Sequence, residues 1–238
     1  EVVMRIVGIL GGMGPEATVL LMQKVINSVD AKDDGHHIPM IVHQNTQVPS
    51  RIVRILESKG QDPSPILQGM ALDLQNLQCD FLAMPCNTAH YYHSAISKTL
   101  RIPLLNMIEL SVEQLSQSDL KKIGILASPA VRTVGVFDKS FEKRGLKFQF
   151  SRNDSNMLNM IKNIKRGQVG PSVIDAFSFE ISQLLNDGCD ALLIACTELS
   201  LLHKYLPRDV VCVDSLDSLT KKIVLLAINA SPISFGSS

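Results

Sequence analysis

The chain has 238 residues, 45% of them apolar, which is enough for a sizeable core in one domain or two. Its 23 basic residues balance its 23 acidic ones, so the sequence predicts neither a nucleic-acid partner nor a membrane-surface partner. We expect a cytoplasmic protein, because there is no apolar run of ~18 residues, no visible signal peptide, and no dense cysteine framework among the five cysteines.

The first half of the chain alternates short apolar runs with helical patterns. Residues 5–10 form an apolar run that predicts a buried strand, and a helix at 16–29 begins after Pro15, which suits a first helical position. The other expected elements are strands at 40–44, 80–84 and 103–106, helices at 63–77 and 88–100, a helix ending near 116, and an uncertain segment at 52–56.

The loop Gly11–Pro15, with Met13 at its centre, joins the first strand to the first helix. A strand, a glycine-rich loop and a helix N-terminus can together hold an anion, because free backbone N–H groups point at it. The dinucleotide and P-loop patterns are both absent. Three interpretations stay open: a cradle for a small carboxylate, a tight turn that only packs backbone, and a nucleotide site.

Arg51 lies on a polar loop just past the second strand. Its planar guanidinium could clamp a carboxylate. The alternative interpretation is an ordinary surface arginine.

The pattern restarts at residues 122–126, which echo residues 5–10. Strands alternating with helices predict parallel α/β sheets. We expect an α/β fold of two similar lobes, at residues 1–108 and 109–214, with a cleft between the carboxyl ends of their strands. The expected elements of the second half are strands at 146–150, 191–195 and 210–213, helices at 133–144, 156–165, 172–187, 197–205 and 216–227, and a loose tail from residue 231.

A repeat relates the two halves: the segment from Cys79 to Cys86 returns 110 residues later as the segment from Cys189 to Cys196. A repeat of this period points to two similar lobes. Cys86 and Cys196 both follow a strand and open a helix, where α/β folds bind ligands. A helix N-terminus lowers a thiol pKa from ~8.5 toward neutrality, so we expect reactive thiols. Buried structural thiols are the alternative interpretation.

Two cysteines facing one cleft suit the inversion of a stereocentre. One thiolate takes a proton from a carbon, and the opposite thiol returns a proton on the other face. Residues that can cap the following helices and donate to a substrate are Asn87, Thr88 and Thr197. The cysteines interpreted as plainly buried are Cys79, Cys189 and Cys212.

A metal site is not predicted. The C-x-x-C spacing of zinc sites is missing. His90 and His93 stand one helical turn apart but lack an acidic or cysteine partner at matching spacing, and His36-His37 has the character of a solvated loop.

Three motifs in this order carry a resemblance: residues 11–18 (Gly-Gly-Met-Gly-Pro-Glu-Ala-Thr), 84–90 (Met-Pro-Cys-Asn-Thr-Ala-His) and 196–199 (Cys-Thr-Glu-Leu). Together they resemble the cofactor-independent aspartate/glutamate racemase family, closest to its aspartate racemase branch. The resemblance implies a two-lobed pseudo-symmetric α/β fold with the active site between the lobes. It also implies racemisation without pyridoxal phosphate, metal or other cofactor, with Cys86 and Cys196 as the acid/base groups.

The resemblance further implies a substrate-binding set and an assembly. Arg51 would bind a substrate carboxylate, and Lys165 would approach the substrate, with Lys162 one turn earlier as its rival. The C-terminal helix, residues 215–228, would return to the first lobe, and the assembly would be a homodimer. The full substrate-binding set is Met13, Arg51, Asn87, Thr88, Lys165, Thr197 and Glu198.

Aspartate is the expected substrate, because Gly11–Gly14 and Cys196-Thr197-Glu198 depart from the Asp-Ser-Gly and Cys-Thr-His motifs typical of glutamate racemases. The stretch 127–133 also departs from the threonine-rich turn of many members. Alternatives left open are a broad-specificity or glutamate-type racemase, a related cysteine-based isomerase or decarboxylase, and a catalytically silent small-molecule-binding homologue.

Overall fold

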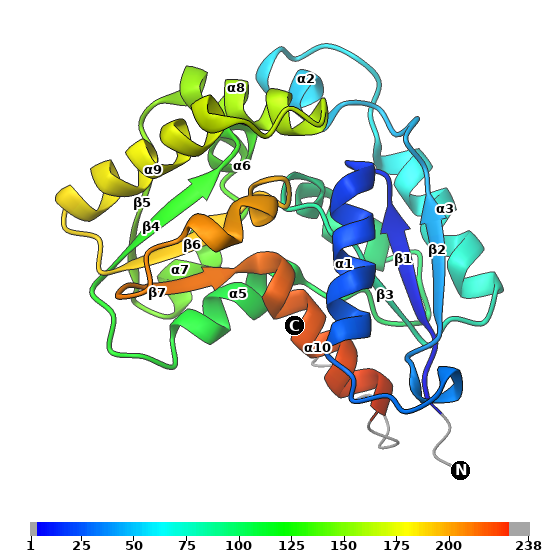
Figure 1. The fold of residues 1–238 in the computed structure, drawn as a ribbon. Helices are drawn as coiled ribbons and strands as arrows, with labels where there is room; N and C mark the ends of the chain where they lie inside the picture. The colour runs from blue at the N-terminus through cyan, green and yellow to red at the C-terminus, as the bar shows by residue number, and fades with distance from the viewer. Residues whose placement is uncertain (1–3, 229–238) are drawn as a thin grey trace.

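The computed structural model describes residues 4–228 as two parallel β-sheets, each covered by helices on both faces (Figure 1). The first sheet has the strand order β2-β1-β3, and the second has the order β5-β4-β6-β7. All pairings within the sheets are parallel. The strands are β1 (Val7–Gly11), β2 (Met40–Gln44), β3 (Phe81–Ala83), β4 (Lys122–Ala127), β5 (Lys147–Phe150), β6 (Ala191–Ala195) and β7 (Val211–Asp214).

Helices of two kinds connect the strands. The α-helices are α1 (Pro15–Asn27), α2 (Arg51–Leu56), α3 (Ser64–Asn76), α4 (His93–Ser97), α5 (Met107–Leu115), α6 (Pro129–Val134), α7 (Asp138–Lys143), α8 (Asp154–Lys165), α9 (Pro171–Asn186) and α10 (Ser215–Ile228). The 3₁₀ helices are η1 (Asp34–His36), η2 (Thr88–Tyr92) and η3 (Leu199–Tyr205). The two-sheet α/β architecture predicted from the alternating pattern is confirmed.

The two sheets are built alike. The central strands β1 and β4 are buried almost throughout, as expected for strands of a parallel sheet that is covered on both faces. The repeated Cys-Asp pair does the same work in each lobe: Asp80 accepts a hydrogen bond from the Ile6 amide at 2.7 Å, and Asp190 accepts from the Lys122 amide at 2.9 Å. Each aspartate therefore ties the start of its strand to the neighbouring central strand.

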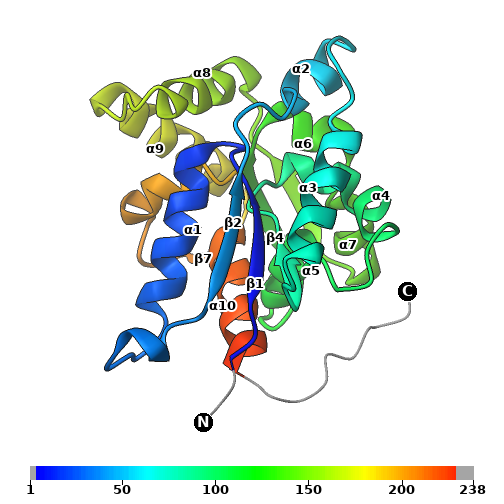
Figure 2. The same cartoon turned by 90° about the vertical axis from the view of Figure 1, so that its right-hand side faces the viewer.

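Apolar helix faces sandwich each sheet. Figure 2 shows α1 and α3 on opposite sides of the first sheet. Helix α3 packs on one face, and α1 and α10 share the other, where Leu21, Leu219 and Ile223 meet Val7 and Ile9. On the second sheet, α8 and α9 cover one face, and α5 and α7 cover the other. Helix α10 thus packs against β1. The lobe boundaries 1–108 and 109–214 stay a prediction.

Two expected elements are wrong in the first half. Residues 103–106 form only an isolated bridge between Leu82 and Leu104, because Asn106 turns the chain by capping α5 through its side chain. The helix expected at 88–100 is η2 followed by the short α4. The His90 ring occupies the Cys86 carbonyl at 2.8 Å, the acceptor that an α-helical amide of residue 90 would use, while that amide bonds the Asn87 carbonyl instead.

The expected helix at 133–144 is also wrong. It is two short helices, α6 and α7, separated at Gly135, whose φ of +61° ends α6 in the left-handed region that favours glycine. The expected helix at 197–205 is the 3₁₀ helix η3, and the uncertain segment at 52–56 belongs to α2. The tail expected from residue 231 lies outside the described residues. Among the described helices, none is both long and apolar enough to cross a membrane.

Candidate active site

Cys86 and Cys196 line one small cavity, just past the carboxyl ends of β3 and β6. The cavity has a volume of about 20 Å³, which accommodates about one water molecule. Its walls come from both halves of the chain. They are formed by Met13, Arg51, Ile52, Cys86, Thr88, Ser128, Ile161, Lys165, Cys196 and Glu198.

A larger pocket of about 330 Å³ shares three of these walls, Arg51, Lys165 and Glu198. It is bordered by the glycine-rich loop and the start of α1, and its volume falls within the range of small-molecule sites. Gly12 shapes this loop: its φ is +95°, and an added Cβ would lie 2.4 Å from the Asn45 backbone, so a side chain does not fit. The charged trio therefore stands between an outer pocket and the thiols.

A chain of polar contacts leads from Cys196 to the outer pocket. The Cys196 thiol donates to Glu198 Oε2 at 3.1 Å, and the other carboxylate oxygen lies 3.3 Å from Lys165 Nζ. Burial and the adjacent Glu198 charge raise the pKa of the Cys196 thiol well above its usual range. The expectation of a lowered pKa is wrong for Cys196, because these two effects outweigh a favourable charge at Lys165.

The repeat is chemically asymmetric around its two cysteines. Two positions after Cys196 stands the carboxylate of Glu198, whereas two positions after Cys86 stands the hydroxyl of Thr88. Thr88 Oγ1 lies 3.3 Å from Ser128 Oγ, which belongs to the second lobe. Only one of the two equivalent positions therefore brings a carboxylate to its thiol.

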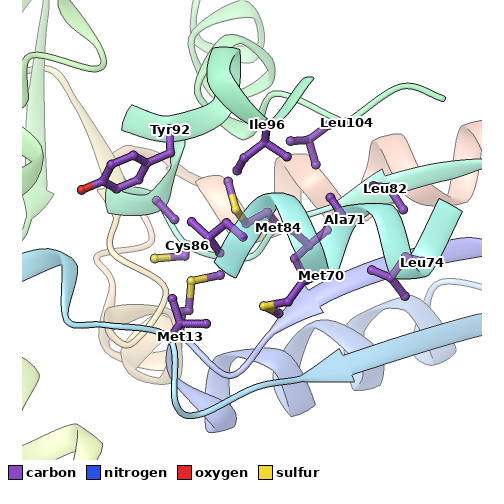
Figure 3. Close-up of a cluster of buried hydrophobic side chains, with 14 of the residues drawn as sticks. Met13, Met70, Ala71, Leu74, Leu82, Met84, Cys86, Tyr92, Ile96 and Leu104 are labelled. Carbon is purple, nitrogen blue, oxygen red and sulfur yellow. The ribbon is translucent and has the colours of Figure 1, made fainter. Parts of the chain in front are cut away.

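Cys86 belongs to the apolar core of the first lobe. Figure 3 shows Cys86 and Met13 at one end of the core cluster that Met70, Leu74 and Leu82 continue. The loop behind Cys86 is fixed by His90, whose Nδ1 bonds the Cys86 carbonyl and whose Nε2 accepts from the Met107 amide at 3.0 Å. Burial lowers the pKa of His90 to about 3, so the ring is neutral. A neutral imidazole can donate at one nitrogen and accept at the other, as both bonds require.

Arg51 is buried at the first residue of α2, after the helix cap Ser50, rather than exposed on a polar loop. In the described part of the chain its guanidinium donates to three backbone carbonyls: to Pro49 at 3.0 Å, to Val48 at 3.3 Å and to Met13 at 3.5 Å. The buried Nε has no hydrogen-bond partner among the described residues. A buried guanidinium with a free donor suits an anionic ligand.

Two further residues join separate segments of the chain rather than line the cavity. Thr197 donates to the Pro85 carbonyl at 3.1 Å, beside Cys86. The Asn87 amide group donates to Ser215 Oγ at 2.9 Å, while its buried Oδ1 has no hydrogen-bond partner in the described structure. Thr197 therefore helps to hold the loop before Cys86, and Asn87 helps to hold the start of α10.

The structure brings together most of the residues selected from the sequence. Met13, Arg51, Thr88, Lys165 and Glu198 line the cysteine cavity, whereas Asn87 and Thr197 stand behind it. Lys162 lines neither pocket. Sequence analysis missed three residues of the cavity wall, Ile52, Ser128 and Ile161. The departure noted at 127–133 was a signal for Ser128, whereas the apolar periodicity of the helices hid Ile52 and Ile161.

The other cysteines lie away from the cavity. Burial raises the pKa of Cys79 to about 11, raises that of Cys189, and raises that of Cys212 to about 11. These cysteines are protonated near neutral pH, in agreement with a packing role.

The histidine pair selected from the sequence is held by backbone groups. The rings of His90 and His93 stack with centroids 5.6 Å apart, and His93 Nε2 lies 2.9 Å from the Leu104 carbonyl. Within residues 4–228, the group of three side chains that could hold a metal ion is His203, Asp214 and Asp217, and it lines neither pocket.

Two thiols at equivalent places of a repeat share one cavity with a carboxylate and two cations, an arrangement that suits acid/base chemistry. The chain belongs to the Asp/Glu/hydantoin racemase family, whose model matches residues 10–223, and it is an amino-acid racemase, that is, an isomerase.

Individual relatives agree with this assignment. A broad-specificity amino-acid racemase of Bacillus subtilis is 25% identical, over 92% of this chain and 96% of its own. The aspartate racemase of Picrophilus torridus has a similar structure, with a TM-score of 0.85, 25% identity and 94% of each chain covered. A glutamate racemase of Aquifex pyrophilus is 27% identical over 62% of this chain and 58% of its own.

Proposed function

We propose that the protein racemises aspartate by a two-base mechanism without a cofactor, using Cys86 and Cys196. The observation that carries the proposal is the placement of both thiols, at equivalent points of the repeat, on one cavity. Support for an acidic substrate comes from the buried Arg51, whose Nε has no partner among the described residues, and from the nearby Lys165. The similar structure named an aspartate racemase adds further support.

The reaction would start with Cys196 protonated, because its pKa is raised. A Cys86 thiolate takes the α-proton, and the Cys196 thiol gives its proton to the opposite face of the same carbon. This leaves Cys86 as a thiol and Cys196 as a thiolate, with the substrate inverted. In the reverse direction Cys196 is the base, and Glu198 is placed to accept its proton beforehand.

The substrate would enter from the outer pocket. An amino acid does not fit into about 20 Å³, whereas about 330 Å³ is available on the other side of the Lys165–Glu198 ion pair. A substrate carboxylate that pairs with Lys165 would compete with Glu198. Substrate binding would therefore be coupled to separation of the Lys165–Glu198 ion pair.

Proton NMR in D₂O, with a panel of L-amino acids and no added cofactor, tests this function. We expect the α-proton signal of aspartate to disappear, and to persist with a Cys86→Ser/Cys196→Ser double variant. No exchange with any amino acid of the panel would reject the racemase mechanism and favour a binding role for the cavity. Exchange that is faster with neutral amino acids than with aspartate would favour the broad-specificity alternative, which the Bacillus subtilis relative supports.

Replacing Glu198 by glutamine should lower kcat by about 10²-fold, since it removes the group that exchanges a proton with Cys196. The carboxylate charge raises the pKa of Cys196, so its removal should lower that pKa. The limb of the pH–rate profile that reports this thiol should therefore move to lower pH.

Glu113→Gln, on the exposed side of α5, is the matched control and should leave rate and profile unchanged. A slower Glu198→Gln enzyme with an unshifted profile would mean that Glu198 acts on packing alone.

We also propose a cytoplasmic homodimer. The support for the location is the zero net charge together with the free cysteines, and the support for the dimer is the assembly usual for the family that the motifs resemble. Sedimentation at several concentrations would test the dimer.

A further inference from the structure

A cluster of charged side chains lies away from the thiols, where η3 meets the junction of β7 and α10. Figure 1 shows β7 running into α10, with α1 packed beside α10. The cluster combines His203 from η3, Asp214 from the end of β7 and Asp217 from the first turn of α10. One ligand atom from each residue lies within 4.8 Å of the others.

Asp214 is the feature that needs an explanation. Its side chain is fully buried. One oxygen, Oδ1, accepts from Ser200 Oγ at 2.8 Å and from the Leu216 amide at 2.9 Å. The other, Oδ2, has no hydrogen-bond partner among the described residues and faces His203 Nδ1 at 3.7 Å. Apart from this ion-pair contact with His203, the buried oxygen makes no hydrogen bond within the described residues, and a cation in direct contact with it would remove the energetic cost of its burial.

Asp217 offers a second oxygen to the same space. Its Oδ1 is paired with Lys24 Nζ of α1 at 2.6 Å, which leaves Oδ2 3.9 Å from His203 Nδ1. Lys24 neutralises part of the negative charge at Asp217, but within the described residues it forms no ion pair with Asp214. Its ammonium would also oppose a nearby cation, which gives the test a useful direction.

We propose that His203, Asp214 and Asp217 bind a divalent first-row transition-metal ion. One imidazole and two carboxylates suit such ions, with water completing the coordination. Neighbouring ligand atoms around an ion at about 2.0–2.2 Å lie roughly 3–3.6 Å apart, so the cluster must contract slightly. His203, whose side chain is 49% exposed, can supply that movement.

The ion would act on structure and takes no part in the racemase reaction. It would join η3, which follows Glu198, to the start of α10. Ser215, next to Asp214, accepts the hydrogen bond from Asn87, which adjoins Cys86. The metal would therefore fasten segments behind both cysteines, and this inference does not depend on the substrate.

Mn²⁺ is the probe of choice, because carboxylates suit it and the thiols of the cavity compete poorly for it. Titration of the whole protein, followed by the EPR signal of free Mn²⁺, should show saturable binding of about one ion per chain, as the single cluster requires. His203→Ala and Asp217→Asn should each raise the Kd at least about 10-fold. Lys24→Gln should lower the Kd, because it removes the opposing ammonium.

A histidine–aspartate pair elsewhere gives the matched control. His43 Nδ1 lies 3.9 Å from Asp73 Oδ2 without a third ligand, so His43→Ala should not change Mn²⁺ binding. Mn²⁺ should also raise the Tm of the unaltered protein and not that of His203→Ala. Absence of saturable binding, or equal binding by His203→Ala and the unaltered protein, would overturn the proposal.

Discussion

Replacing either Cys86 or Cys196 by serine is expected to lower racemisation by about 10³-fold while leaving the fold intact. Both thiols line the same cavity, and each would protonate the α-carbon on the face opposite to the one that the other deprotonates. Serine is nearly isosteric but far less acidic, so it cannot replace a thiol in either role. The rate is measured from each enantiomer by circular dichroism, and the fold by thermal unfolding.

Deuterium exchange separates this mechanism from one that uses a single base. In a two-base enzyme each enantiomer loses its proton to a different thiol. Cys86→Ser should therefore exchange the α-proton of one enantiomer only, and Cys196→Ser that of the other, both without inversion. Exchange of both enantiomers by either variant would show that one thiol serves both faces.

Cys212→Ser is the matched control for the paired variants. Cys212 lies in β7, outside the cavity, and burial raises its pKa to about 11. Its replacement should leave both rates unchanged. Near-normal turnover by Cys86→Ser or Cys196→Ser would contradict the assignment of both thiols.

Replacing Arg51 by alanine is expected to lower kcat/KM for aspartate by about 10²–10³-fold, mainly through KM. The guanidinium is buried, and its hydrogen bonds within residues 4–228 go to backbone carbonyls, so a substrate carboxylate would be its charged partner. Arg51→Lys keeps the charge but loses the planar fork, and should recover only part of the loss. Competition by aspartate and by its neutral amide, asparagine, measures the effect on binding.

If the substrate carboxylate that Arg51 binds is the side-chain one, which asparagine lacks, the loss should be much larger for aspartate than for asparagine. Arg54→Ala removes a positive charge from the same helix, at an exposed position, and should change neither ligand. An equal loss for both ligands would move Arg51 to a group that they share, such as the α-carboxylate.

The alternation of apolar runs and helical patterns was sufficient to predict the two parallel sheets. It failed where local side-chain bonds replace backbone bonds. The His90 ring takes the carbonyl of Cys86 and so converts an expected α-helix into η2. Asn106 caps α5 and stops an expected strand after one bridge. Such competition depends on which acceptor a side chain reaches, which periodicity does not encode.

The candidate site was predicted from a repeat and from motifs, and both describe positions rather than environments. The repeat located Cys86 and Cys196, and their expected place at helix N-termini predicted lowered pKa values for both thiols. Burial and Glu198 reverse that direction at Cys196. Ile52 and Ile161 have helical apolar spacing, so only the packing of α2 and α8 reveals them as cavity walls.

The packing of α10 on the first sheet has a consequence for synthesis on the ribosome. Val7 and Ile9 emerge long before Leu219 and Ile223, which help to cover them. The second sheet has its covering helices within its own stretch of chain, from α5 to α9. The nascent chain can therefore bury the second core before α10 emerges, while the part of the first sheet that α10 covers stays exposed until then.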